Sequence, residues 1–284
     1  MKSGFPVIVG LLAIGAILLI LYENTSLFAS GSEENSIEVT ERIDTVSINT
    51  HSSDMNIVPE SRSDVKASLN GRGELSVRKK GDTIEVEVKK KWYELFDFNE
   101  ESDVKVYVPE NFDRGLKLEV GSGNVTLDGG SDPFVLDEVD IDMSSGDVKL
   151  SNLETKQFEH NGSSGRLTID QLKTEEGSFD ISSGDVVLRG YKGPLDGEMS
   201  SGEMNVQMDK LTGDVSFDLS SGDVELDLPD DADFTLDTEA SSGDISTSFT
   251  LKEQSITNNG ISGVHGSGKH KVSISLSSGN AQVY

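Results

Sequence analysis

The chain has 284 residues, no cysteine, and a formal net charge of −27, from 24 lysine and arginine residues against 51 aspartate and glutamate residues. Without cysteine it can form neither a disulfide nor a thiolate zinc site. The acidic balance excludes nucleic acid as a general partner, because binding a phosphate backbone needs a positively charged surface.

An apolar segment opens the chain. Residues 5–22 are uncharged and almost wholly apolar, Lys2 precedes them, and Glu23 follows. This length is just sufficient for a membrane-spanning helix. We therefore predict a cytoplasmic tip at 1–4, a transmembrane anchor at 5–22 and a polar linker at 23–36. A cleaved signal peptide is the alternative, although residues 24–30 offer no clear Ala-x-Ala site. The positive-inside rule places the rest of the chain outside the cytoplasm, at the cell membrane.

Residues 37–115 are predicted to form an irregular N-terminal β segment and cap. Alternating apolar residues predict a strand at 43–48, followed by a His-Ser-Ser-Asp corner at 51–54. A hairpin is predicted around 80–82, because apolar residues alternate on both sides of that Lys-Gly-Asp turn.

A basic and aromatic segment within this region is a candidate interaction patch. It contains the chain's only tryptophan, and nine of the 24 basic residues fall between Arg62 and Lys91. Basic and aromatic side chains together suit an anionic polymer or a lipid headgroup surface. The alternative is that the aromatic residues cap an open end of the fold. The candidate residues are Lys89, Lys90, Lys91, Trp92, Tyr93 and Phe96.

Eight corners of the type small residue-Ser-Gly recur along the remainder of the chain. Up to Gly243 the successive glycines are 18 to 23 residues apart, which is the spacing of stacked supersecondary repeats. The corners are centred on Gly123, Gly146, Gly165, Gly184, Gly202, Gly222, Gly243 and Gly279.

The apolar residues around each corner alternate with a period of two, which is typical of half-buried strands. Before Gly222 they include Leu219, and after it they include Val224, five positions later. An unbroken strand would place these two residues on opposite faces, so the chain must turn at the corner to bury both. Glycine suits such a turn because it adopts positive φ at little cost.

These patterns predict an all-β fold. One coil of about 20 residues cannot bury its own apolar face, whereas stacked coils bury one another. We therefore predict a parallel β-solenoid over residues 116–284, after an N-terminal transmembrane helix. An antiparallel β-sandwich is the alternative, because strands at regular 8–12-residue spacing suit that fold too.

The position after each corner glycine is usually acidic, so stacked coils would carry a ladder of like charges. Calcium could bridge such a ladder, or the acidic residues could simply be solvated turn residues. We predict no cofactor, with calcium as the alternative. Arg166 stands at this position between Asp147 and Asp185, and a parallel stack should bring its guanidinium between their carboxylates.

Motifs for catalysis are weak. There is no Gly-x-Ser-x-Gly sequence, and His160 falls at an inward position of its repeat, where a structural role is expected. Residues 263–269 match most of a phosphate-binding loop, but His270 occupies the Ser/Thr position and a strand pattern follows where that loop needs a helix. Fifty-one acidic residues could include a glycosidase pair, yet no pair stands out.

The serial Ser-Ser-Gly-Asp-Val corners, the strand end at 106–109 and the terminal Ser-Gly-Asn-Ala-Gln-Val resemble the putative-adhesin β-strand-repeat domain family of bacterial envelope proteins. The short N-terminal anchor at 5–22 is also typical of this family, so the resemblance covers residues 37–284 and the anchor. It implies a non-enzymatic, membrane-anchored interaction or scaffold protein with a role in cell-envelope stress response. The partners expected are the membrane and an envelope protein or wall polymer. A polysaccharide-active enzyme and a calcium-stabilised adhesin are the alternatives.

Overall fold

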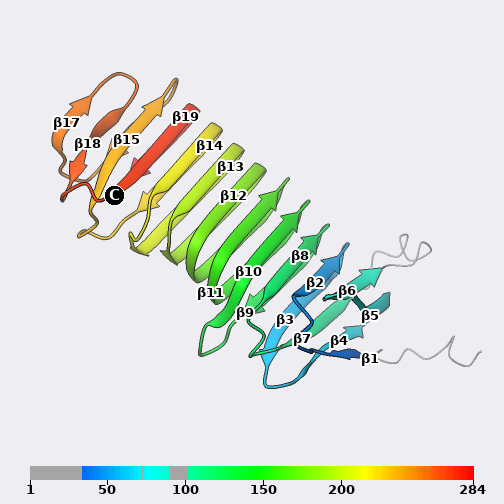
Figure 1. Ribbon diagram of the computed structural model, residues 1–284. Coiled ribbons are helices and arrows are strands. Elements are labelled where there is room, and N and C mark those ends of the chain that lie inside the picture. Colours follow the sequence, from blue (N-terminus) through cyan, green and yellow to red (C-terminus); the bar gives the residue numbers. More distant parts are fainter. Residues whose placement is uncertain (1–33, 72, 90–101) are drawn as a thin grey trace, which may run out of the picture. The chain divides into compact units, whose positions relative to one another are not determined.

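The structure is a computed structural model that describes residues 34–71, 73–89 and 102–284. These residues form 19 strands and no helix, which confirms the all-β prediction (Figure 1). No helix among them is long and apolar enough to cross a membrane. The predicted transmembrane helix at 5–22 lies outside the described residues.

The central strands form a stack of parallel coils. β10 pairs with β11 at an offset of one repeat, and the same parallel pairing continues to β14. This solenoid-like arrangement agrees with the predicted parallel stack, whereas the sandwich alternative requires antiparallel neighbours. The strands are β8 (Gly115–Val120), β9 (Asn124–Asp128), β10 (Phe134–Met143), β11 (Asp147–Gly162), β12 (Arg166–Lys192), β13 (Leu195–Lys210) and β14 (Val215–Asp227).

The corners stack directly on one another. The amide of Arg166 donates to the carbonyl of Gly146 at 3.0 Å, and the amide of Asp185 donates to that of Gly165 at 3.0 Å. Gly165 has a φ of 104°, and all eight corner glycines have positive φ as predicted. The turn at each corner therefore repeats in register from coil to coil.

Both arms of each coil face one interior. Leu219 and Leu226, on either side of the Gly222 corner, are 3% and 0% exposed. The predicted phase is confirmed at the other corners as well, so the two runs share one continuous core. The buried residues flanking these corners include Val139, Ile141, Met143, Val148, Leu150, Phe179, Ile181, Val186, Leu188, Phe217, Val224, Leu228, Ile274, Leu276, Ala281 and Val283.

At the C-terminal end the coils do not follow the order of the sequence. β19 lies between β14 and β15, pairing in parallel with β14 along one edge and with β15 and β16 along the other (Figure 1). β18 pairs antiparallel with β15, and β17 with β18. The strands are β15 (Phe234–Ala240), β16 (Ile245–Thr247), β17 (Lys252–Ile256), β18 (Ile261–His265) and β19 (His270–Val283).

At the N-terminal end, too, strands are inserted between strands that are not their neighbours in the sequence. β2 lies between β6 and β8, and β3 lies between β7 and β9, all in parallel register. β4 pairs antiparallel with β7, β1 with β4, and β5 with β6, the last forming the predicted hairpin around Gly81. The strands are β1 (Glu34–Glu38), β2 (Thr45–Thr50), β3 (Asp54–Glu60), β4 (Asp64–Asn70), β5 (Glu74–Lys80), β6 (Thr83–Lys89) and β7 (Asp103–Pro109).

Candidate binding groove

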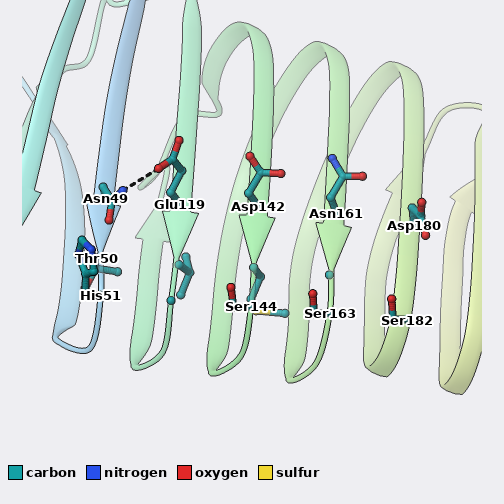
Figure 2. Close-up of a pocket in the computed structure, with 14 residues that line it drawn as sticks. Asn49, Thr50, His51, Glu119, Asp142, Ser144, Asn161, Ser163, Asp180 and Ser182 are labelled. Atoms are coloured by element: carbon teal, nitrogen blue, oxygen red, sulfur yellow. Dashed lines mark hydrogen bonds between the residues drawn. The ribbon is translucent and has the colours of Figure 1, made fainter.

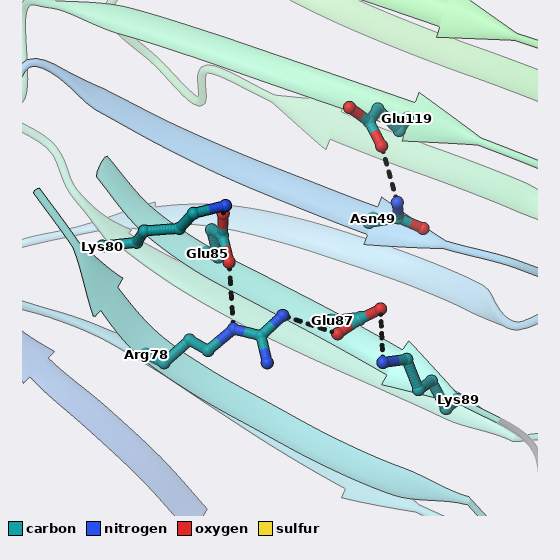
Figure 3. Close-up of polar contacts among 7 residues, drawn as sticks. All are labelled: Asn49, Arg78, Lys80, Glu85, Glu87, Lys89 and Glu119. Carbon is teal, nitrogen blue, oxygen red and sulfur yellow. Dashed lines mark hydrogen bonds and ion pairs between the residues drawn. The ribbon is translucent and has the colours of Figure 1, made fainter. Parts of the chain in front are cut away.

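The predicted basic and aromatic patch lies mostly outside the described residues. Of its members only Lys89 is described, at the end of β6, where its Nζ lies 2.9 Å from Glu87 Oε1 (Figure 3). The placement of Lys90, Lys91, Trp92, Tyr93 and Phe96 is not described, so their joint role stays a prediction.

Other basic side chains at this end are engaged by carboxylates on the neighbouring strand. Arg78 on β5 contacts Glu85 at 2.9 Å and Glu87 at 3.0 Å, and Lys80 contacts Glu85 at 3.2 Å (Figure 3). The hydrogen bond from Arg78, followed by that from Lys80, lowers the pKa of Glu85. Because these cations are paired within the fold, they offer an anionic polymer less free charge than the sequence indicated.

A polar groove crosses the coils at the C-terminal ends of β2 and β8, just before the glycine corners. It has a volume of about 480 Å³ and runs from β2 over β8, β10 and β11 to β12 (Figure 2). Strand alternation produces it, since every second residue before a corner points away from the core. Its polar lining consists of Asn49, Thr50, His51, Glu119, Asp142, Ser144, Asn161, Ser163, Asp180 and Ser182.

Two columns of side chains make up this groove. The residue four positions before the glycine carries a carboxylate or carboxamide at the first four corners, namely Glu119, Asp142, Asn161 and Asp180, and Asn49 aligns with Glu119. The residue two positions before the glycine is a serine in three of these coils. Successive strands lie about 4.8 Å apart, so the pair of polar groups recurs at this spacing in β10, β11 and β12.

Hydrogen bonds hold several of the carboxylates in place. Asn49 Nδ2 donates to Glu119 Oε2 at 2.6 Å, and Lys117 Nζ donates to Asp142 at 2.9 Å and Asp140 at 3.0 Å. The hydrogen bond to Asp142, followed by that to Asp140, raises the pKa of Lys117, so the lysine stays charged. The groove therefore combines fixed acceptors with hydroxyl groups.

Hydrogen bonds from Asn49 and Lys117 orient the carboxyl groups of Glu119 and Asp142 as acceptors. Among the described residues, no three histidine, aspartate or glutamate side chains form a group that could hold a metal ion. The repeated columns can instead contact an extended polar ligand once per coil.

Arg166 interrupts the acidic ladder after the corners, as predicted, but it forms an ion pair with only one of its two acidic neighbours. Arg166 Nη2 lies 2.9 Å from Asp185 Oδ2, and this hydrogen bond is the main cause that raises the pKa of Arg166. Asp147 is aligned with Arg166 on the other side and acts on it at longer range. The guanidinium thus pairs with Asp185 alone, although Arg166 follows Asp147 in register.

The phosphate-loop-like segment binds a carboxylate of the protein itself. Asp233 Oδ1 accepts hydrogen bonds from the amides of Ser267 at 2.7 Å, Gly268 at 2.6 Å and Lys269 at 3.1 Å. β19 follows this turn, as the strand pattern predicted. These hydrogen bonds, with that from the Ser267 hydroxyl as the largest cause, lower the pKa of Asp233 to about 2.

The groove was not predicted, although its residues form a pattern that is visible once the repeats are aligned. The predictions used the inward residues and the position after each glycine. The outward residues at four and two positions before the glycine share their chemistry from coil to coil. Which of these columns lies in a groove depends on the path of the backbone, and the alternation of apolar and polar residues does not predict that path.

Comparison with known proteins identifies the fold family. The family model described as Toastrack DUF4097 matches residues 43–284. A structure described as a putative adhesin from Parabacteroides merdae ATCC 43184 is similar at 14% identity and a TM-score of 0.52, covering 90% of this chain and 98% of that one. Another, described as a putative adhesin from Bacteroides fragilis NCTC 9343, has 10% identity and a TM-score of 0.51, covering 90% and 97%. No curated protein matches. At these identities the structural likeness concerns the fold alone.

Proposed function

The chain belongs to the Toastrack DUF4097 family, and from this we propose that it is a non-enzymatic interaction or scaffold protein of the bacterial cell envelope. In this proposal residues 5–22 anchor it in the cell membrane as a single span. The strands after residue 37 lie outside the cytoplasm and contact an envelope protein or wall polymer, in a role connected with envelope stress response. The resemblance of the repeats to adhesin-type envelope domains supports this setting.

The groove from Asn49 to Ser182 is the observation that supports the binding role in this proposal. It presents carboxylate, carboxamide and hydroxyl groups in columns with the spacing of the coils. An extended polar segment lying across the coils meets an equivalent pair of groups at β10, β11 and β12. Affinity then accumulates over several weak contacts, as expected for multivalent binding.

Site-specific photocrosslinking in intact cells tests this proposal. A photoreactive amino acid replaces Asn161 in the groove of the full-length chain, and a matched control places it at Thr168. Both side chains are half-buried and polar, but Thr168 lies on the arm after the Gly165 corner. We expect a specific adduct from position 161 and none from position 168. Equal labelling at both positions, or no adduct at position 161, would contradict binding through the groove.

Membrane topology is tested separately. A reporter fused after Tyr284 should be active outside the cytoplasm, and the protein should stay with the membrane after a high-salt wash. Deleting residues 5–22 should release a soluble domain. Recovery of a shortened, soluble form of the full-length chain would instead indicate a cleaved signal peptide.

A further inference from the structure

The position of β19 separates two elements that are consecutive in the sequence. β14 ends at Asp227 and β15 begins at Phe234, but β19 lies between them. It forms parallel ladders with both neighbours. We call this strand position between β14 and β15 the acceptor position.

β19 fits the acceptor position through features of its own sequence. Gly279 stacks between Gly222 and Gly243, and a Cβ atom on Gly279 would lie 1.8 Å from the carbonyl oxygen of Gly222. The same distance separates a Cβ atom on Gly243 from the carbonyl oxygen of Gly279. Five side chains of β19 are buried in the core, namely Val272, Ile274, Leu276, Ala281 and Val283.

A short turn connects β18 to β19 across the beginning of β15. His265 and His270 both align with Phe234, one on each edge of β15. Gly266 and Gly268 in this turn have φ values of 70° and 80°. Asp233, the residue before β15, holds the turn by the three amide hydrogen bonds described above and by a fourth from the Ser267 hydroxyl at 2.6 Å.

We propose that the acceptor position also takes β19 from a second copy of this chain, so that two chains exchange this strand and form a dimer. The ladders, the buried side chains and the stacked glycines of β19 are the same whether the strand comes from its own chain or from a partner. The two arrangements differ at residues 266–269, which turn back in the monomer and extend between the two chains in the dimer. Asp233 therefore sets the balance, because its hydrogen bonds form only with the closed turn.

Cysteine pairing between two chains tests the exchange directly, because the chain has no cysteine of its own. Glu225 on β14 faces Gln282 on β19 in register. Neighbouring strands lie about 4.8 Å apart, within reach of a disulfide. One full-length chain carries Glu225→Cys and a second, differently tagged chain carries Gln282→Cys. A disulfide between them forms when β19 of the second chain occupies the acceptor position of the first.

Asp233→Ala in both chains should raise the yield of the interchain disulfide about tenfold over Asp231→Ala, an exposed acidic residue in the same loop, because the turn loses its charged acceptor. Gly268→Ala should have the same effect from the other side of the contact, so the test does not depend on one variant folding. Replacing Gln282→Cys by Lys149→Cys should abolish the disulfide. If neither Asp233→Ala nor Gly268→Ala raises the yield, or if the Lys149→Cys pair crosslinks equally, strand exchange is wrong.

Discussion

The corner glycines combine two requirements at the residue scale. The sequence predicted positive φ, which the turn needs, but it did not predict the closeness of the stacking. A Cβ atom on Gly165 would lie 2.2 Å from the carbonyl oxygen of Gly146, and one on Gly184 would lie 2.4 Å from that of Gly165. Glycine is therefore required by its own backbone conformation and also by the close approach of the neighbouring coil. The close approach could not be predicted, because it depends on distances between repeats.

Gly165→Ala should destabilise the fold by about 3 kcal/mol or more, because it adds a backbone clash to the strain of positive φ. Gly130→Ala is the matched control. Gly130 has a φ of 88° but open space around its Cβ position, so we expect a loss of about 1 kcal/mol. Chemical denaturation of both variants measures the difference, and equal losses would show that stacking does not constrain the corner.

His160 is a second residue whose role depends on packing. It is 1% exposed, aligned between Ile141 and Phe179 in the core, and its Nδ1 atom has no hydrogen-bond partner. Burial disfavours the charged imidazolium and lowers the pKa of His160 to about 4. The sequence placed this residue correctly on the inward face, and its phase alone was sufficient for that prediction.

Acidification should therefore destabilise the protein through His160. The unfolded chain takes up a proton near pH 6.5, whereas the folded chain resists protonation until about pH 4. Stability is retained above pH 6.5 and falls as the pH drops toward 4, by about 2 kcal/mol between about pH 7.5 and about pH 5. His160→Leu should lose this component, so the difference between variant and wild type in pH-dependent denaturation isolates it. Parallel pH profiles would contradict a neutral buried histidine.

At the scale of strands, the insertion of β19 changes the order of the residues in the acidic ladder, the column of residues that follow the corner glycines. In the sequence Asn280 is the last member, but in the structure it lies between Asp223 and Asp244, donating its Nδ2 proton to Asp223 at 2.8 Å. The spatial order of the ladder is Asp54, Asn124, Asp147, Arg166, Asp185, Glu203, Asp223, Asn280 and Asp244. Asn280 thus separates Asp223 from Asp244, which chain order does not reveal, while Asp185, Glu203 and Asp223 remain neighbours.

Arg166→Asp should lower the melting temperature most strongly at low salt. The substitution would join the carboxylates of Asp147 and Asp185 into one uninterrupted acidic run, and salt screens repulsion between exposed charges. Arg166→Gln removes the ion pair without adding charge, so its effect should be smaller and less dependent on salt. Thermal melts at several salt concentrations measure this, and a loss independent of salt for Arg166→Asp would exclude the electrostatic explanation.

The outer strands β5 and β17 have features that disfavour pairing with other chains. β5 carries Arg78, Lys79 and Lys80 as exposed residues, and charged side chains discourage edge-to-edge association. In β17, Glu253 has a φ of 51° and the pairing with β18 is interrupted there. A strand with such an irregularity is a poor template for another strand.

At the scale of the whole domain, residues 34–284 form one compact unit with one continuous core. The all-β class, the inward-facing positions and the parallel stacking were predictable, because the alternation of apolar residues and the glycine corner recur in each repeat. The insertion of β2 between β6 and β8, and of β19 between β14 and β15, was not predictable, because it depends on which coils meet in space. The same limit applies to the groove, whose columns are visible in the sequence while its depth is not.

Intrachain disulfide formation tests the central structural claim, that the coils stack in parallel register with β19 between β14 and β16. In this arrangement Glu225 faces Gln282, while Ser246 faces Gln282 from the other side. Glu225→Cys with Gln282→Cys should oxidise within one dilute chain. Glu225→Cys with Ser246→Cys should stay reduced, because two strand spacings of about 4.8 Å exceed the reach of a disulfide. The reverse result, a disulfide from position 225 to 246 and none to 282, would show that the coils follow sequence order and would contradict the structure described here.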